Sequence, residues 1–209
     1  YDMTKIFAHR GASAYAPENT MEAFELAAKQ GADGIELDVH VTKDGEVVVT
    51  HDEKIDRVSN GSGFIKDMTL RELKRLSFHN HMESYVGAGI PTLREVLEYV
   101  STTNMDVNIE LKTGIYWYPQ IEEKTAFIVQ ETGMHDRVIY SSFNHHSIAK
   151  IKEIDSTAET AWLFSDVILN VEQYAKANGV EGLHPAVYHM YMSDFMKRWN
   201  ESGEKVRVW

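Results

Sequence analysis

The sequence predicts an α/β fold in which eight strands alternate with helices and form a (β/α)₈ TIM barrel. The first observation is a regular alternation after residue 92, where short apolar runs are each followed by a longer segment with helical apolar spacing. The second is that eight strands fit within a chain of 209 residues. An open doubly wound sheet is the alternative that this alternation also allows.

Each predicted element has a local signal. The apolar stripe of the first helix follows a possible N-cap at Asn19 or Thr20, and Gly31 ends it. Strands are predicted at residues 5–8, 34–41, 47–50, 106–112, 137–142, 160–164, 180–184 and 205–209. Further helices are predicted at residues 69–76, 92–100, 120–131, 145–153, 171–177 and 193–200.

A single domain spanning residues 1–209 is predicted, because no linker or shift in composition divides the chain. The connection from Asp38 to Val47 is too short for a helical crossover between parallel strands. The two strands are therefore either antiparallel, or the chain returns in extended form and re-enters the sheet. We favour the second arrangement, because we expect only that one to bring His51 to the end where Asp38 lies. Residues 53–91 break the alternation and are interpreted as an excursion after the third strand.

The composition narrows the class of protein. A formal net charge of -11 argues against a nucleic-acid binder, and the absence of cysteine excludes disulfides and thiolate metal sites. No apolar run approaches the roughly 18 residues of a membrane span, so no stable membrane insertion is expected. We expect a cytoplasmic protein. Because the chain starts at Tyr1 rather than Met, a leader that has been removed stays open as an alternative.

Carboxylates in the second and fourth strands are candidate metal ligands. Glu36 and Asp38 alternate along one strand, so both side chains point to the same face. Two neighbouring carboxylates resist burial unless a cation lies between them or one is protonated. With Glu110 they form a set of oxygen ligands, which favours Mg²⁺ or Ca²⁺ over zinc or copper. The alternative is that these acids form ion pairs with Arg10 and Lys112.

Two histidines are candidates for proton transfer. His9 and His51 each follow a predicted strand, and the active site of a barrel lies at the carboxyl ends of its strands. Arg10 and Lys112 could bind an anion, although each could equally be the partner of a carboxylate. The aromatic segment at residues 116–118 either lines a substrate entrance or covers the rim of the barrel.

These segments resemble the glycerophosphodiester phosphodiesterases, which belong to the phospholipase-C-like group of barrels. The resemblance is dense over residues 5–112 and thinner but ordered as far as Trp209. It is carried by His9-Arg10-Gly11, Pro17-Glu18-Asn19-Thr20, Glu36-Leu37-Asp38-Val39, Thr42-Lys43-Asp44-Gly45, His51-Asp52, Glu110-Leu111-Lys112 and Ser142-Phe143.

The resemblance implies a (β/α)₈ barrel with a small insertion after the third strand. It implies a divalent metal, Mg²⁺ or Ca²⁺, held by Glu36, Asp38 and Glu110. The family continues beyond the strand at Trp209 through a closing helix, so we expect that helix to be missing from this chain.

The resemblance also implies that His9 and His51 form the catalytic acid–base pair. The remaining groups that it places at the substrate, or in support of that site, are Arg10, Lys112, Phe143, Trp209, Glu18 and Asn19.

The resulting hypothesis is a metal-dependent hydrolase that cleaves glycerophosphodiesters to sn-glycerol 3-phosphate and an alcohol. One histidine would remove the proton of the glycerol 2-hydroxyl, which attacks phosphorus, and the other would protonate the leaving alcohol. We favour His9 as the acid and His51 as the base. The alternatives are a phospholipase D-type enzyme acting on lysophospholipids, and a non-catalytic module that binds phosphate esters. The partner is a small molecule in each case, and the sequence predicts no oligomeric state.

Overall fold

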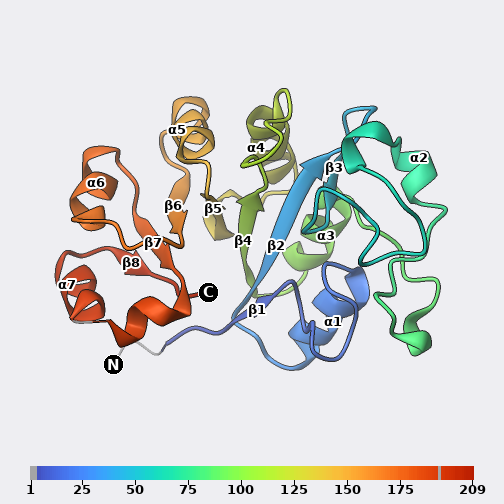
Figure 1. The fold of residues 1–209 in the computed structure, drawn as a ribbon, viewed down its shortest axis with the longest axis horizontal. Coiled ribbons are helices and arrows are strands. Elements are labelled where there is room, and N and C mark those ends of the chain that lie inside the picture. Colours follow the sequence, from blue (N-terminus) through green and yellow to red (C-terminus); the bar gives the residue numbers. More distant parts are fainter. Residues whose placement is uncertain (1–3, 193) are drawn as a thin grey trace.

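The computed structural model describes residues 4–192 and 194–209. Its centre is a curled β-sheet with helices around the outside (Figure 1). The strand order is β1-β2-β4-β5-β6-β7-β8, and β3 pairs with β2 outside this path. The strands are β1 (Phe7–His9), β2 (Gly34–Val41), β3 (Val47–Val49), β4 (Asp106–Leu111), β5 (Val138–Ser142), β6 (Glu159–Phe164), β7 (Gly182–Pro185) and β8 (Lys205–Val206).

The strand order identifies the type of sheet. A doubly wound sheet reverses its order at a switch point, whereas here the parallel strands follow one another in chain order. Every pair except β2–β3 is parallel. Within the described ranges no ladder joins β8 to β1. The protein therefore has an α/β fold of the TIM-barrel type, with a curled sheet that is open between these two strands.

The helices begin largely where the sequence predicts. Thr20 accepts a hydrogen bond from the amide of Ala23, while Thr69 and Thr92 each form a capping box with a glutamate three residues later. The predicted start of the last helix, Ser193, lies outside the described residues. The helices are α1 (Met21–Lys29), α2 (Leu70–Leu73), α3 (Leu93–Ser101), α4 (Ile121–Glu131), α5 (His145–Ile154), α6 (Val171–Ala177) and α7 (Phe195–Glu201).

The helices pack on the apolar face of the sheet. Ile35, Leu37 and Val39 of β2 are fully buried in the main hydrophobic core, together with Leu93 and Leu97 of α3. The opposite face of β2 is thereby left for polar side chains, because successive residues of a strand alternate. The longest helix, α4, has 11 residues, and no helix in the described part of the chain could cross a membrane.

The favoured arrangement of the third strand is wrong. β3 runs antiparallel to β2, with Val39 opposite Val49. The prediction fails because it counts the connection from Asp38, whereas β2 runs on to Val41 and leaves only residues 42–46 for a turn back into β3. The returning strand therefore comes back to Asp38, whose carbonyl accepts a hydrogen bond of 3.0 Å from the amide of Thr50. An antiparallel hairpin thus places His51 next to Asp38.

The segment between β3 and α3 forms a small core of its own. It contains α2 and the 3₁₀ turns η1 (Ile65–Asp67) and η2 (Glu83–Tyr85). Isolated bridges join Lys54 to Phe64 and Val48 to Thr92, so the segment is tied to the sheet at its exit. This second hydrophobic cluster consists of Val48, Ile55, Val58, Ile65, Leu73, Phe78 and Ile90.

Candidate active site

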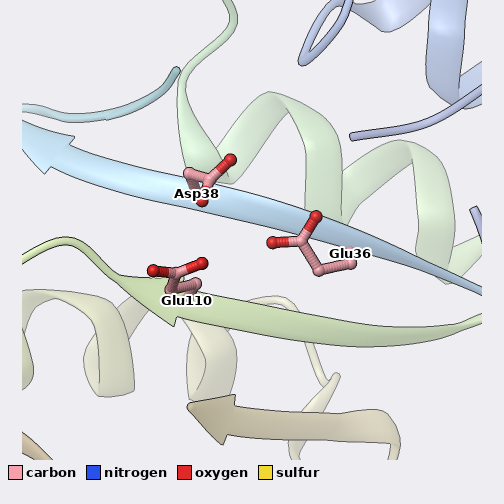
Figure 2. A group of neighbouring side chains, drawn as sticks. All are labelled: Glu36, Asp38 and Glu110. Carbon is pink, nitrogen blue, oxygen red and sulfur yellow. The ribbon is translucent and has the colours of Figure 1, made fainter. Parts of the chain in front are cut away.

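Three carboxylates from neighbouring strands face one another (Figure 2). Glu36 and Asp38 lie on one face of β2, and the parallel register places Glu110 of β4 directly beside Asp38. One oxygen from each carboxylate lies within 4.8 Å of the others. Asp38 is fully buried, while the side chains of Glu36 and Glu110 are 12% and 11% exposed. The alternation and the register together produce the cluster that the sequence predicts.

The electrostatics of this cluster favour a bound cation. Burial raises the pKa of Glu36 well above its usual value, and the charges of Asp38 and Glu110 raise it further. Burial, with the charge of Glu110, raises the pKa of Asp38 to about 7. One oxygen of Asp38, Oδ1, is buried without a hydrogen-bond partner. Three neighbouring carboxylates, one of which has an oxygen without a hydrogen-bond partner, fit a divalent cation such as Mg²⁺ or Ca²⁺.

Two basic side chains border the carboxylates. Arg10 Nε lies 3.7 Å from Asp38 Oδ2, and Lys112 Nζ lies 3.2 Å from Glu110 Oε1. Burial opposes the charged form of Lys112, but the carboxylates of Glu110 and Asp38 outweigh it and raise the lysine pKa. Ion pairing therefore occurs, as the alternative interpretation of the sequence allows. Two bases cannot balance three carboxylates, however, so these ion pairs leave room for a cation.

The loop between β1 and α1 supports the site from one side. Asn19 Nδ2 donates a hydrogen bond of 2.9 Å to Asp38 Oδ2, and Glu18 Oε1 accepts one of 3.2 Å from Arg10 Nη1. Arg10 and Asn19 both have positive φ angles, and the amide of Asn19 donates to the carbonyl of Arg10. The loop is thus folded tightly, and both predicted residues, Glu18 and Asn19, contact a site residue.

The two predicted histidines flank the acidic cluster in different surroundings. His9 Nε2 lies 3.7 Å from Glu36 Oε2, and its side chain is 60% exposed. Partial desolvation, together with the charge of Arg10, lowers the pKa of His9. The ring of His51 is held from both ends, with Nδ1 2.7 Å from Asp52 Oδ1 and Nε2 3.3 Å from Lys112 Nζ.

Comparison with known proteins gives this arrangement a family. The model of the Glycerophosphoryl diester phosphodiesterase family matches residues 9–209. The chain belongs to this family.

Relatives of this family member support the assignment over nearly the whole chain. A glycerophosphodiester phosphodiesterase from Caldanaerobacter subterraneus subsp. tengcongensis is 41% identical over 207 residues, which cover 99% of this chain and 85% of that protein. Another, from Bacillus altitudinis, is 48% identical over 187 residues, covering 88% of this chain and 76% of that protein.

Solved structures of similar proteins share the fold of this family member. A glycerophosphodiester phosphodiesterase from Agrobacterium tumefaciens has a TM-score of 0.86 and 31% identity, covering 99% of this chain and 86% of that one. An Oleispira antarctica phosphodiesterase, solved in complex with the product sn-glycerol-3-phosphate, has a TM-score of 0.92 and 27% identity, covering 99% and 84%.

Two residues of this family member belong to the site although the sequence reasoning missed them. His40 is buried, its Nε2 lies 2.9 Å from the carbonyl oxygen of His51, and its Nδ1 lies 2.7 Å from the hydroxyl of Tyr118. Burial lowers the pKa of His40 to about 4, so the ring is neutral. The alternation of Glu36 and Asp38 continues to His40 and could have revealed it. Arg57 donates hydrogen bonds to Asp52 and Glu18, but it lies in an irregular loop, where no periodicity indicates the direction of its side chain.

The remaining predicted substrate contacts lie together in this family member. The rings of Phe143 and Trp209 meet edge to face with centroids 5.6 Å apart, and both side chains are about half exposed. Trp209 Nε1 donates a hydrogen bond to the carbonyl of His184. Their contact with substrate stays a prediction. The aromatic segment at 116–118 divides, because Tyr118 is buried against His40 whereas Trp117 is 51% exposed.

Proposed function

We propose that the protein hydrolyses glycerophosphodiesters to sn-glycerol 3-phosphate and an alcohol. The observation that carries this proposal is the buried cluster of three carboxylates, bordered by two cationic side chains and two histidines. An anionic diester needs positive charge at phosphorus, and its cleavage needs groups that take up and supply protons. The relatives named as glycerophosphodiester phosphodiesterases support the choice of substrate.

The phosphate would lie between the side chains that border the carboxylates. Arg10 offers a planar fork of donors and Lys112 a compact charge, and both suit phosphate oxygens. Glu36, Asp38 and Glu110 would hold the divalent metal. When bound, this metal supplies positive charge that polarises the phosphodiester and orients the glycerol hydroxyls.

His51 is the better candidate for the general base. Although burial opposes it, hydrogen bonds from Arg57 and His51 lower the pKa of Asp52 to about 2, so Asp52 is an acceptor. The ring of His51 therefore donates from Nδ1 and carries its lone pair on Nε2. Nε2 would take the proton from the glycerol 2-hydroxyl, whose oxygen attacks phosphorus and forms a cyclic phosphate.

His9 is the better candidate for the general acid. Its side chain is 60% exposed to solvent beside Glu36, so a leaving alcohol could depart there. A lowered pKa makes the protonated ring a stronger acid towards that alcohol. In the second half of the reaction the roles reverse, so that His9 activates water and His51 returns its proton to the 2-oxygen as the cyclic phosphate opens.

The direct test is product release from purified protein. We expect sn-glycerol 3-phosphate from at least one of glycerophosphocholine, glycerophosphoethanolamine and glycerophosphoglycerol with Mg²⁺ or Ca²⁺, and no release with a chelator. The Glu110→Gln variant should lose this metal-dependent activity. Binding of these compounds by calorimetry without any product would overturn the proposal in favour of a non-catalytic binding module.

One observation favours lysophospholipids as a second candidate substrate. The connections at 113–120, 143–144, 165–170 and 186–192 contain a single charged residue, Asp166, although 25% of the whole chain is charged. Several side chains in the loops that follow the strands are apolar and exposed, and could contact an acyl chain. They include Tyr15, Ile115, Trp117, Phe143, Leu169 and Tyr191.

A competition assay separates the two substrates. Faster turnover of lysophosphatidylcholine than of glycerophosphocholine would favour the lysophospholipid, provided that the Leu169→Ser variant loses this preference. Turnover of glycerophosphocholine alone would exclude it.

The same proposal includes the complete fold. We infer a (β/α)₈ barrel in one domain, with residues 53–91 as an insertion after the third strand. The separate hydrophobic cluster of that segment supports the insertion. The sequential order of the parallel strands supports the barrel.

A further inference from the structure

Arg57 lies between two carboxylates that belong to different loops. Its Nε and Nη2 donate to the two oxygens of Asp52 at 2.8 and 3.1 Å. Its Nη1 and Nη2 donate to the two oxygens of Glu18 at 3.0 and 2.7 Å. One guanidinium thus makes two bidentate contacts, one with the loop after β3 and one with the loop after β1.

Each of these carboxylates also holds a residue of the site. Asp52 Oδ1 lies 2.7 Å from His51 Nδ1, and Glu18 Oε1 accepts a hydrogen bond of 3.2 Å from Arg10 Nη1. A continuous chain of charge-assisted contacts therefore runs from the ring of His51 through Asp52, Arg57 and Glu18 to the guanidinium of Arg10.

The geometry of the guanidinium explains why an arginine is needed here. Two carboxylates that approach the same point repel each other unless a cation separates them. The planar fork of arginine can serve both carboxylates at once, whereas lysine carries one compact ammonium and cannot make two parallel pairs. Although burial opposes it, the hydrogen bond of Arg57 and the charge of Arg10 lower the pKa of Glu18. Both carboxylates therefore remain acceptors.

We propose that Arg57 is a positioning residue, which fixes the His51 ring with its lone pair on Nε2 and holds Arg10 in place for the phosphate. This inference rests on the proposed function, because it assigns Arg57 to the base and to the anion-binding group of that reaction. Arg57 acts through Asp52 and Glu18 and need not touch the substrate.

A purely structural role predicts a different pattern of effects. If Arg57 only ties one loop to another, its replacement lowers stability and the amount of folded protein but leaves kcat per folded molecule unchanged. If it positions the two groups, its replacement lowers kcat because His51 is displaced, and raises KM because Arg10 is displaced. A displacement of about 1 Å in a reacting group can cost roughly 100-fold in rate.

The first experiment compares Arg57→Gln, Arg57→Lys and a matched control. Arg71 is an exposed arginine on α2, so Arg71→Gln controls for the loss of a surface charge in the same segment. We expect Arg57→Gln to lower kcat by roughly 10- to 100-fold and to raise KM. Arg57→Lys should recover only part of the lost kcat, and Arg71→Gln should have the kcat and KM of wild type. Unchanged kcat and KM in folded Arg57→Gln would overturn the proposal.

Two further variants separate the effect of Arg57 on His51 from its effect on Arg10. Asp52→Asn should lower mainly kcat, and Glu18→Gln should raise mainly KM. Adding Arg57→Gln to Glu18→Gln should raise KM no further, because both changes break the same link. Additive effects on KM would contradict the link through Glu18. Low-millimolar guanidinium should partly restore kcat in Arg57→Ala, whereas urea at the same concentration should not.

A readout without substrate separates this inference from the proposed function. In protein labelled with ¹⁵N-histidine, the ring shifts of His51 should report a proton on Nδ1 in wild type and a mixture of tautomers in Arg57→Gln. The same spectrum in both proteins would overturn the positioning role, whatever the activity. If wild type released no product from any glycerophosphodiester, the proposed function would fail, while the spectra would still decide the role of Arg57.

Discussion

The two site histidines differ in what their nitrogens contact, and this difference decides what each can do. His51 is bound at Nδ1 by Asp52, near Lys112 at Nε2, and held through its carbonyl oxygen by His40. His9 has a largely exposed ring beside Glu36. A base that deprotonates a hydroxyl needs a fixed tautomer and direction, whereas an acid that serves a departing alcohol needs access to solvent. The surroundings thus support the proposal that His51 is the base and His9 the acid.

Leaving-group chemistry tests this assignment. An alcohol is a poor leaving group and needs a proton, whereas p-nitrophenolate leaves without one. We expect His9→Ala to lower kcat on glycerophosphocholine by roughly 10²- to 10⁴-fold but to retain most activity on the p-nitrophenyl ester of glycerol phosphate. His51→Ala should lose activity on both substrates. Circular dichroism should show that both variants are folded.

The opposite pattern would reverse the roles. If His51→Ala spared the p-nitrophenyl ester and His9→Ala did not, His51 would be the acid. Equal losses on both substrates in both variants would show that neither histidine acts only on the leaving group.

At the scale of the element, the sequence predicts the features that follow a local, repeated pattern. It misses the direction of a strand and the contacts between residues far apart in the chain. Apolar periodicity and threonine caps predict the helices, because both signals are local. Alternation within β2 predicts the pair formed by Glu36 and Asp38. The direction of β3 depends on how the chain turns after Val41 and pairs with β2, which apolar periodicity does not give. Arg57 contacts Glu18 across 39 residues of chain, so only the folded structure reveals this contact.

The loop between β1 and α1 depends on close contact with the helix. Gly11 has φ +80, and a Cβ at this position would lie 2.7 Å from both the carbonyl carbon and the Cβ of Ala23. The amide of Ala12 donates to the carbonyl of Ala23 at 2.9 Å, so the loop and the helix cannot separate without losing this bond. Gly11 therefore allows the loop that presents His9 and Arg10 to lie on α1.

We expect Gly11→Ala to destabilise the protein by about 3 kcal/mol, from backbone strain and the clash together, and to lower kcat/KM. Gly133 provides a matched control, because its φ is +67 and a Cβ at this position would meet no other atom within 4 Å. Gly133→Ala should cost only about 1 kcal/mol and leave kcat/KM unchanged. Urea unfolding and steady-state kinetics measure both effects. Equal losses of stability in the two variants would refute the role of the contact with α1.

At the scale of the whole molecule, the acidic cluster links stability to protons and to metal. In metal-free protein the pKa of Asp38 is raised from 3.8 to about 7, and that of Glu36 is also raised. A carboxyl with a raised pKa in the folded state binds more protons there than in the unfolded state, so stability falls as pH rises. The contribution of Asp38 is complete below about pH 4 and is lost as pH rises through 7. A cation between the carboxylates replaces the missing protons and reverses this loss.

The variant Asp38→Asn isolates this effect from the other titrating groups, because an amide resembles the protonated acid. In the presence of a chelator we expect Asp38→Asn to melt at a higher temperature than wild type at pH 8, with a smaller difference at pH 5.

Saturating Mg²⁺ or Ca²⁺ at pH 8 should then raise the melting temperature of wild type. At 100 times the dissociation constant the gain is about 2.7 kcal/mol, or roughly 5–10 °C in a chain of this size. Asp38→Asn should show little of this gain, because the variant lacks one of the three carboxylates. Two results together would rule out the cluster as the metal site. The melting temperature of wild type would be unaffected by either metal, and the difference in melting temperature between Asp38→Asn and wild type would be constant from pH 5 to 8. The variant with the more stable metal-free fold should therefore be the less active enzyme, because the repulsion that destabilises the metal-free cluster would also favour binding of a cation.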